Sequence, residues 1–378
     1  MRDKSLHCDV LVIGGGVIGL SLAWQLALRG RQVTVLDAGD LGRGASWAGA
    51  GILPPGPTRE INDSYDQLCS LSHKMHPEWA AQLMEATGID TGFRKSGGVY
   101  LARSPAEAAT LRGNELTWEQ QGIAFARWST DELIQNEPEL ARLGESLRGA
   151  WFFPAEYQVR NPRHLRALRA ACENLGVRLI ENEPVESIGK PSIEFQSHLD
   201  IRAGERHYQA EVACICSGAW ARRNLLQLGQ NNGIMPVRGQ MVLYKCEKPL
   251  LKAIVNEGHR YLVPRDDGRL LAGSVEEEVG YKIETTPQAI QQIQSWAQGI
   301  LPQLRACAIE RTWAGLRPGS FDGWPYLGAI PGYDNLFVAA GHFRSGLYLS
   351  CATASILAEL IITGACSIDL FPFRVGRG

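Results

Sequence analysis

The sequence lacks any pair of cysteines spaced Cys-x-x-Cys, although it contains nine cysteines. An odd number of scattered cysteines in a chain of 378 residues argues against a disulfide framework and indicates a reducing compartment. Cys214 and Cys216 are two residues apart on one face of an expected strand. Core packing is the simpler interpretation of this pair, because a metal site needs more ligands nearby. We therefore expect no metal and a cytoplasmic location.

The sequence also lacks an excess of charge of either sign. Its 38 basic and 40 acidic side chains leave a net charge of −2. A protein that binds nucleic acid or an anionic membrane usually carries a basic face. We therefore expect neither nucleic acid nor a membrane among its partners.

No long apolar run is free of polar or glycine interruptions. Residues 11–28 are apolar but broken by glycines and preceded by Asp9, which disfavours a signal peptide. Residues 345–364 are long enough for a bilayer span. Because they include Glu359 and many small polar side chains, we interpret them as a buried helix.

Familiar hydrolase signatures are missing as well. We find no Ser-His-Asp arrangement, no His-Glu-x-x-His motif and no convincing pair of carboxylates. The composition, 45% hydrophobic and 21% charged, is typical of a globular protein with a substantial core. The length suffices for two domains.

The first forty residues predict a βαβ unit. An apolar run at 8–13 predicts a buried strand, helical spacing covers 17–29, and a second β-type run covers 32–37. Further helices are expected at 58–88 and at 161–175, and the last at 345–363. Other strands are expected at 211–216 and 336–340, with antiparallel sheet between 234 and 274.

The segment "VIGGGVIGL" contains a G-x-G-x-x-G motif formed by Gly14, Gly16 and Gly19. The first glycine allows a tight turn, the second lets a pyrophosphate approach the backbone, and the third lets helix and strand pack closely. The following helix N-terminus attracts an anion. Asp37 ends the next strand, where an acidic residue accepts hydrogen bonds from a ribose and repels a 2′-phosphate. A dinucleotide site explains this context better than a chance glycine turn.

FAD is favoured over NAD by the rest of the chain. The sequence returns to the nucleotide domain at Ser217-Gly218 and again at "NLFVAAGHFRSGL". The second return predicts a strand, a glycine turn and a helix that begins near Ser345. That helix N-terminus would face the flavin edge that gains negative charge on reduction.

Four segments carry a resemblance to a known family: "DVLVIGGGVIGLSLAWQLALRGRQVTVLDAG", "GRGASWAGAGIL", "TWAGLRP" and "GHFRSG". They resemble the glycine oxidase family of the D-amino-acid oxidase superfamily, and the resemblance spans nearly the whole chain. It implies hydride transfer from a small amine-bearing acid to FAD, with O2 as acceptor. The implied products are glyoxylate or another 2-oxo acid, ammonia and H2O2. Related proteins supply glycine imine for the thiazole of thiamine. Non-covalent FAD is implied because "WAGLRP" contains no cysteine, whereas related sarcosine oxidases attach flavin in that region.

The resemblance also completes the expected fold and cofactor site. The fold class is α/β, with a discontinuous FAD-binding Rossmann-like domain (1–88, 151–232 and 316–378). A mainly antiparallel β (α+β) substrate domain (89–150 and 233–315) is inserted into it. Beside the three motif glycines, the expected FAD contacts are Val17, Ile18, Asp37, Ala38, Ala45, Ser46, Ala50, Gly51, Ile52, the Val185 backbone, Gly218, His342, Phe343, Arg344, Ser345, Gly346, Leu347 and Tyr348.

Arg317 is the main candidate for substrate binding. A guanidinium stays charged at any ordinary pH, so a partly buried one needs an anion. The carboxylate of an amino-acid substrate would serve, and the alternative is an internal salt bridge. The resemblance adds Tyr261, whose alternative is a half-buried sheet aromatic, and Arg344, whose alternative is a surface charge.

Three further residues bear on the substrate site. Ile52 stands where the family often has methionine, which leaves the pocket size and the exact substrate open. We assign no residue as an acid or base. We interpret the His342 side chain as a helix cap or a buried core group, and His259 as a turn residue.

Several alternatives stay open at this point. The protein could pass electrons to a membrane acceptor as a dehydrogenase, or oxidise sarcosine or D-proline. A flavoprotein domain that modifies tRNA is disfavoured by the slightly negative charge. A non-catalytic dinucleotide-binding module would leave Arg317 and Arg344 unexplained. The sequence leaves the oligomeric state open, and a homo-oligomer is one of the alternatives.

Overall fold

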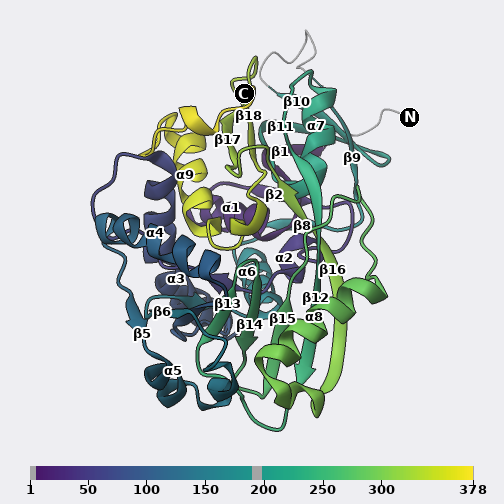
Figure 1. Ribbon diagram of the computed structural model, residues 1–378. Helices are drawn as coiled ribbons and strands as arrows, with labels where there is room; N and C mark the ends of the chain where they lie inside the picture. Colours follow the sequence, from purple (N-terminus) through teal and green to yellow (C-terminus); the bar gives the residue numbers. More distant parts are fainter. Residues whose placement is uncertain (1–5, 190–197, 378) are drawn as a thin grey trace.

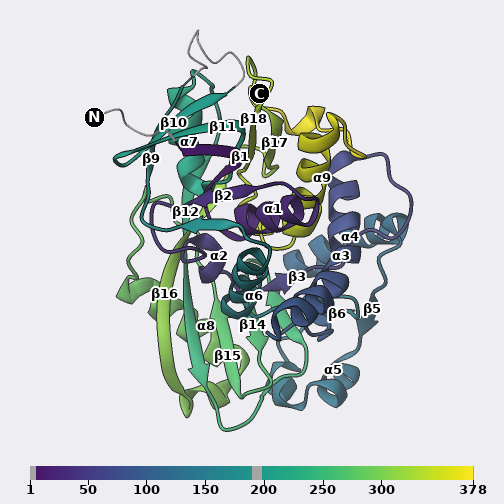
Figure 2. The ribbon, with the colours of Figure 1, turned by 180° about the vertical axis from the view of Figure 1, so that it is seen from behind.

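A computed structural model describes residues 6–189 and 198–377. Two sheets form the frame of the molecule, one in the upper and one in the lower half of Figure 1. Both are assembled from segments far apart in the sequence, as the mixture of colours in each half shows (Figures 1 and 2).

The first sheet has the strand order β17-β18-β11-β1-β2-β8, with β10 and β9 continuing from β11. Its central pairs are parallel, and β17 adds an antiparallel edge. Its central strands read as short apolar runs because both faces of the parallel sheet are covered. The strands are β1 (Leu6–Ile13), β2 (Val33–Leu36), β8 (Arg178–Ile180), β9 (Val185–Gly189), β10 (Leu199–Ala203), β11 (Arg206–Ile215), β17 (Tyr326–Ala329) and β18 (Leu336–Ala340).

Four helices pack together on one face of this sheet, and α1 contacts both α6 and α9. In Figure 1 the other three of these helices lie around α1, near the middle of the molecule. A shorter helix, α7, contributes to the core on the other face. These helices are α1 (Val17–Leu28), α3 (Ser64–Thr87), α6 (Asn161–Asn174), α7 (Ala221–Gln227) and α9 (Ser350–Thr363).

The last helix begins later than expected. The sequence predicts a start near Ser345, but a 3-10 turn occupies Phe343–Ser345 and α9 begins at Ser350. Phe343 has φ 49°, outside the helical region, and Ser345 N–H and Ser350 N–H each bond to a carbonyl three residues back, so regular helix follows only afterwards. In the described part of the chain, no helix has both the length and the apolar character to cross a bilayer.

The second sheet has the order β16-β12-β15-β14-β13-β4-β6-β5 and is antiparallel except between β13 and β4. Helix α8 packs on one face, and the opposite face contacts Ala50 and Ile52 from the first half of the chain. The elements are β4 (Gly98–Ala102), β5 (Ala126–Trp128), β6 (Gly149–Phe153), β12 (Met235–Lys245), β13 (Ile254–Glu257), β14 (Arg260–Pro264), β15 (Arg269–Gly273), β16 (Ala308–Gly319) and α8 (Pro287–Ile300).

The predicted fold class is confirmed: a discontinuous Rossmann-type parallel sheet is combined with a mainly antiparallel sheet. The domain boundaries stay a prediction, and two of them, at 150/151 and 315/316, fall inside strands β6 and β16. The remaining elements connect or cover the sheets. They are α2 (Ala45–Ala48), β3 (Ile52–Leu53), α4 (Pro105–Gln121), α5 (Thr130–Asn136), β7 (Tyr157–Gln158) and short 3-10 turns.

Candidate active site

A cavity of about 1020 Å³ lies between the two sheets and is lined by residues from the beginning, middle and end of the chain. Every residue predicted to contact the cofactor or the substrate lines this cavity, except Gly19. A Cβ atom on Gly19 would overlap the carbonyl oxygen of Gly14. Gly19 therefore allows α1 to pack against β1, as its place in the motif predicts.

One end of the cavity is built around the N-terminus of α1. Gly14 has φ 110°, and a Cβ there would lie 2.6 Å from the Cys216 carbonyl oxygen, so the turn requires glycine. Gly16 caps the helix without a side chain, and the first turn has no acidic residue. Val17 N–H donates to Ser46 Oγ at 2.9 Å. The positive end of the helix is thus left for an anion.

Acceptor oxygens lie beyond this helix terminus. The Asp37 carboxylate accepts hydrogen bonds from Gly15 N–H at 2.7 Å and from Gly39 N–H at 2.9 Å. Burial raises the pKa of Asp37 despite these two bonds. Glu183 also lines the cavity, close to Val185, and its Oε1 is buried without a partner. Donors such as ribose hydroxyls would satisfy these oxygens.

The segment from Ala45 to Ile52 forms the wall between the helix terminus and the second sheet. Gly51 has φ 81°, and a Cβ there would overlap the Val159 carbonyl. Asn161 Nδ2 donates to the Ser46 carbonyl at 2.6 Å, and its Oδ1 is buried without a partner beside the cavity. These contacts fix the backbone of the wall and leave one more acceptor for a ligand.

Arg265 supports the same wall and was missed by the sequence analysis. Its guanidinium donates to the Ala50 carbonyl at 2.8 Å and to the Val159 carbonyl at 3.0 Å. Burial lowers the pKa of Arg265 to about 10, so it still carries its charge at neutral pH. Its only sequence signal is its place at the end of β14, directly before the Asp266-Asp267-Gly268 turn.

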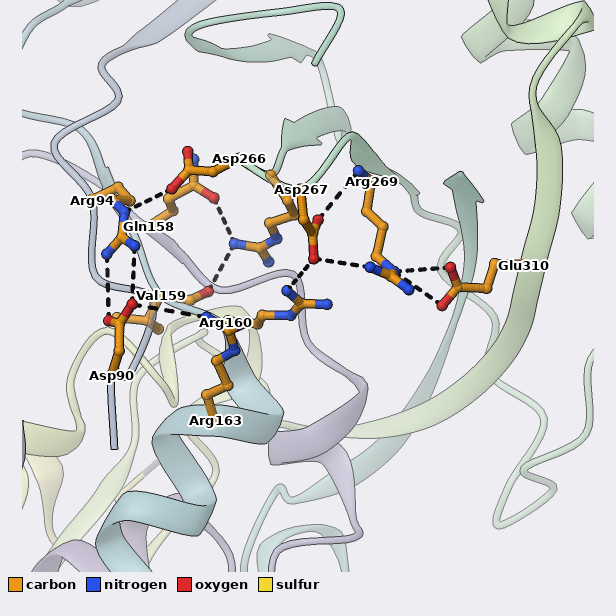
Figure 3. A network of polar contacts seen from close by, with 11 residues as sticks. Asp90, Arg94, Gln158, Val159, Arg160, Arg163, Asp266, Asp267, Arg269 and Glu310 are labelled. Carbon is orange, nitrogen blue, oxygen red and sulfur yellow. Dashed lines mark hydrogen bonds and ion pairs between the residues drawn. The ribbon is translucent and has the colours of Figure 1, made fainter. Parts of the chain in front are cut away.

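A network of ion pairs surrounds this turn (Figure 3). Asp266 pairs with Arg94 at 2.8 Å, and Asp267 pairs with Arg160 at 2.6 Å and Arg269 at 2.9 Å. Each partly exposed pair contributes about 0–1 kcal/mol to stability. The pairs join the turn after Arg265 to Arg94 and to Arg160, the N-cap of α6.

At the end of the cavity away from α1, the floor is formed by a row of residues that runs across the strands of the second sheet. Residues paired directly across neighbouring strands point to the same face. Register places the following residues in this row: Trp313, Met241, Gly273, Tyr261, Asn256 and Tyr100. Tyr261 Oη lies 3.4 Å from Met241 Sδ. Ile52 packs in one apolar cluster with Met241 and Tyr261. The wall from Ala45 to Ile52, which we call the flavin-side wall, therefore meets the floor.

Arg317 extends over this floor from β16. A Cβ on Gly239 would collide with its guanidinium, so glycine leaves room for it. Its Nη2 donates to Ser274 Oγ at 2.6 Å and its Nη1 to the Val275 carbonyl at 3.1 Å. Among the described residues, no carboxylate lies within ion-pair distance of Arg317. The alternative of an internal salt bridge is therefore not what the structure shows.

Arg344 has a different environment. It lies in the 3-10 turn after β18 and forms an ion pair with Glu276 at 2.5 Å. Because α9 starts only at Ser350, Arg344 does not lie in the first turn of that helix. The neighbouring Phe343 has φ 49°, an unfavourable conformation for a large side chain that marks this turn as constrained.

A buried carboxyl group that the sequence analysis missed supports the far end of the floor. Glu156 is fully buried; it accepts hydrogen bonds from Tyr100 Oη at 2.7 Å and from Asn256 Nδ2 at 2.9 Å. Burial raises the pKa of Glu156 to about 7, although these bonds favour the charged form. No local motif marks Glu156, because its partners come from β4 and β13.

We expect Glu156 to make stability depend on pH. The unfolded carboxyl has a pKa of about 4.5 and the folded one about 7. Between these values the folded state binds more protons, so the free energy of unfolding falls as pH rises, by about 3 kcal/mol in total. Relative to Glu156→Gln, the wild type should therefore lose stability between pH 5 and pH 8 in urea titrations. Glu119→Gln, an exposed change on α4, should show no such trend. A wild-type advantage that is constant with pH would contradict the assignment.

His342, His259, Cys214 and Cys216 have packing or turn roles in the described structure. His342 is buried and contacts Thr353 Oγ1 at 3.2 Å, and burial lowers its pKa to about 3. His259 lies in the turn between β13 and β14, as expected. The Sγ atoms of Cys214 and Cys216 touch at 3.7 Å in the core. Within residues 6–189 and 198–377, no group of His, Cys, Asp and Glu is arranged to hold a metal ion.

These residues fit FAD. The α1 terminus, where Gly16 supplies no side-chain cap, suits a diphosphate, and the acceptors on Asp37 and Glu183 suit the ribose and adenine end. The wall from Ala45 to Ile52 and the turn from His342 to Tyr348 would enclose the isoalloxazine. The cavity is also large enough to leave space beside Arg317 for a small substrate.

Comparisons with known proteins agree with this fit. Residues 9–360 match the family model described as FAD dependent oxidoreductase. The chain is 32% identical to a glycine oxidase of Pseudomonas putida, covering 97% of each chain. It is 36% identical to the bifunctional protein ThiO/ThiG of Synechocystis, of which it covers 54%. The crystal structure of glycine oxidase from Geobacillus kaustophilus superposes with a TM-score of 0.93 at 32% identity, covering 99% of this chain and 100% of that one.

Proposed function

The chain belongs to the FAD-dependent oxidoreductase family, and from this premise we propose that it is an oxidase of glycine or another small amine-bearing acid. The net reaction converts the amino acid, O2 and water into a 2-oxo acid, ammonia and H2O2. For glycine the 2-oxo acid is glyoxylate. The observation that carries this proposal is Arg317, a cation without an anionic partner in the described chain, set on the cavity floor beside the flavin-side wall.

FAD, when bound, would accept the hydride, a proton with two electrons, that leaves the substrate Cα. The protein supplies orientation and electrostatics. Arg317 binds the substrate carboxylate with its two-pronged guanidinium, and Ser274 and Val275 hold that guanidinium in place. Tyr261 donates its hydroxyl to the same carboxylate.

The size of the pocket follows from its walls. Ile52 and Met241 both line the cavity and pack in the same apolar cluster. Because Ile52 is β-branched, its side chain adjusts little. We propose that small amino acids are preferred for this reason.

The biological setting is also a proposal. Similarity to glycine oxidases and to ThiO/ThiG supports a role in making the thiazole of thiamine. The scattered reduced cysteines support a cytoplasmic location.

The purified protein should be yellow and should release FAD into the supernatant on acid precipitation. Non-covalent binding is expected because no cysteine lies in the "WAGLRP" segment of β16. Absorbance and fluorescence of the supernatant measure the released flavin. Flavin that stays with the precipitate, or FMN in its place, would contradict the expectation.

Oxygen consumption without an added acceptor tests the reaction itself. We expect O2 uptake with stoichiometric H2O2 on glycine, with sarcosine, D-alanine, D-proline and L-amino acids as comparison substrates. Turnover that requires a quinone would favour the dehydrogenase alternative. Faster turnover of sarcosine or D-proline would identify the alternative amine oxidase.

A further inference from the structure

Two arginines line the substrate end of the cavity, but only one of them keeps its charge available. Arg317 is held by the neutral groups Ser274 Oγ and the Val275 carbonyl. Arg344 donates through Nε to Glu276 Oε1 at 2.6 Å, and its Nη2 lies 2.5 Å from the same oxygen. Summed over these three side chains, the site presents one positive charge rather than two.

One short segment positions both cations. Ser274, Val275 and Glu276 are consecutive residues directly after β15, and each of them contacts one of the two arginines. Arg317 belongs to the second sheet, whereas Arg344 comes from the turn after β18 of the first sheet. The ion pair between Glu276 and Arg344 therefore joins the two walls of the cavity.

A third residue confirms that these charges lie close together. His259 also lines the cavity. Burial lowers the pKa of His259 most strongly; the charges of Arg260, Arg344 and Arg317 lower it further, and Glu276 opposes them. The charge of Glu276 thus acts on His259 together with those of Arg317 and Arg344.

We infer that Glu276 sets the charge preference of the site: by occupying Arg344, it restricts the enzyme to substrates with a single carboxylate. This inference rests on the proposed function and deepens it. A substrate with a second carboxylate, such as aspartate or iminodiacetate, would find its second cation already paired. It would also meet the like charge of Glu276, and such repulsion is a common source of specificity.

The test is Glu276→Gln, which removes the charge and keeps the size of the side chain. In the flavin-loaded enzyme we expect the ratio of kcat/KM for dicarboxylic over monocarboxylic amino acids to rise about 5- to 30-fold, because an exposed ion pair and one like charge are removed. Glu278→Gln is the matched control: Glu278 is exposed two residues away and, in the described chain, has no ion pair. It should leave the ratio unchanged.

A second variant shows whether the gain passes through Arg344. In the double variant Glu276→Gln with Arg344→Met, the second carboxylate has no cation, so the gain should disappear. A ratio that stays high in the double variant, or one that rises equally in Glu278→Gln, would overturn the inference.

Binding of unreactive acids separates this inference from the proposed function. Calorimetry on the flavin-loaded protein gives the affinities for malonate and acetate without any turnover. Glu276→Gln should raise the affinity for malonate relative to acetate by a similar factor, and an unchanged ratio would overturn the inference. If the wild type oxidises no amino acid while this ratio still shifts, the proposed function fails and the charge preference stands.

Discussion

Replacing Arg317 by alanine is expected to lower kcat/KM for amino acids by roughly 30-fold to several thousand-fold. Removing one partner of a desolvated charged pair costs about 2–5 kcal/mol, and each 1.4 kcal/mol is a factor of ten in rate. In the described chain Arg317 has neutral partners but no carboxylate, so the substrate would supply its anion. Steady-state oxygen consumption on glycine measures the effect.

Two controls separate substrate binding from a structural role. Flavin content should be retained in Arg317→Ala, because Arg317 contacts Ser274 and Val275 in the segment after β15 and not the α1 terminus. Arg317→Lys should also be poor, since an ammonium cannot form the two parallel hydrogen bonds of a guanidinium. Loss of flavin in step with activity would favour a structural role. Normal kcat and KM on every amino acid would end the assignment of the active site.

Replacing Asp37 by arginine is expected to weaken FAD binding by about 100-fold or more. Asp37 faces the cavity and accepts two backbone N–H bonds that shape the glycine loop. Hydrogen bonds to a charged group contribute about 1.5–3 kcal/mol each, and an arginine can accept none. Titration of the apoprotein with FAD, followed by flavin fluorescence, gives the dissociation constants.

Two further variants control for folding and for net charge. Asp37→Asn keeps the shape and part of the acceptor capacity, so its loss of affinity should be smaller. Glu119→Arg makes the same charge change on the exposed surface of α4 and should leave FAD affinity unaltered. Equal FAD affinity in Asp37→Arg and the wild type would remove Asp37 from the cofactor site.

Much of the nucleotide-binding half could be predicted from sequence because its signals are local. The glycine motif, the apolar strand before it and the helix after it lie within about thirty residues, and Asp37 follows on the next strand. The steric requirement at Gly19 arises within this unit, from the Gly14 carbonyl, whereas Gly14 is crowded by the Cys216 carbonyl, which directly follows β11. The resemblance to a family added Tyr261 and Arg344 to Arg317, and all three line one cavity with Gly14 and Gly16.

The partners of those residues were decided by the tertiary structure. Glu156 meets Tyr100 and Asn256 only because β4 pairs with β13. Arg265 reaches the Ala50 carbonyl across more than two hundred residues of chain. No spacing rule applies to such contacts, since the strand register and the position of a turn bring the atoms together.

Arg317 and Arg344 illustrate the division best. The sequence predicted Arg317 as a substrate-binding cation because a guanidinium is always charged, and the family resemblance added Arg344. Neither could tell that Arg317 keeps its charge free while Arg344 is neutralised by Glu276. That difference depends on where the segment after β15 passes between the two sheets, and the electrostatics of the site follow from this path.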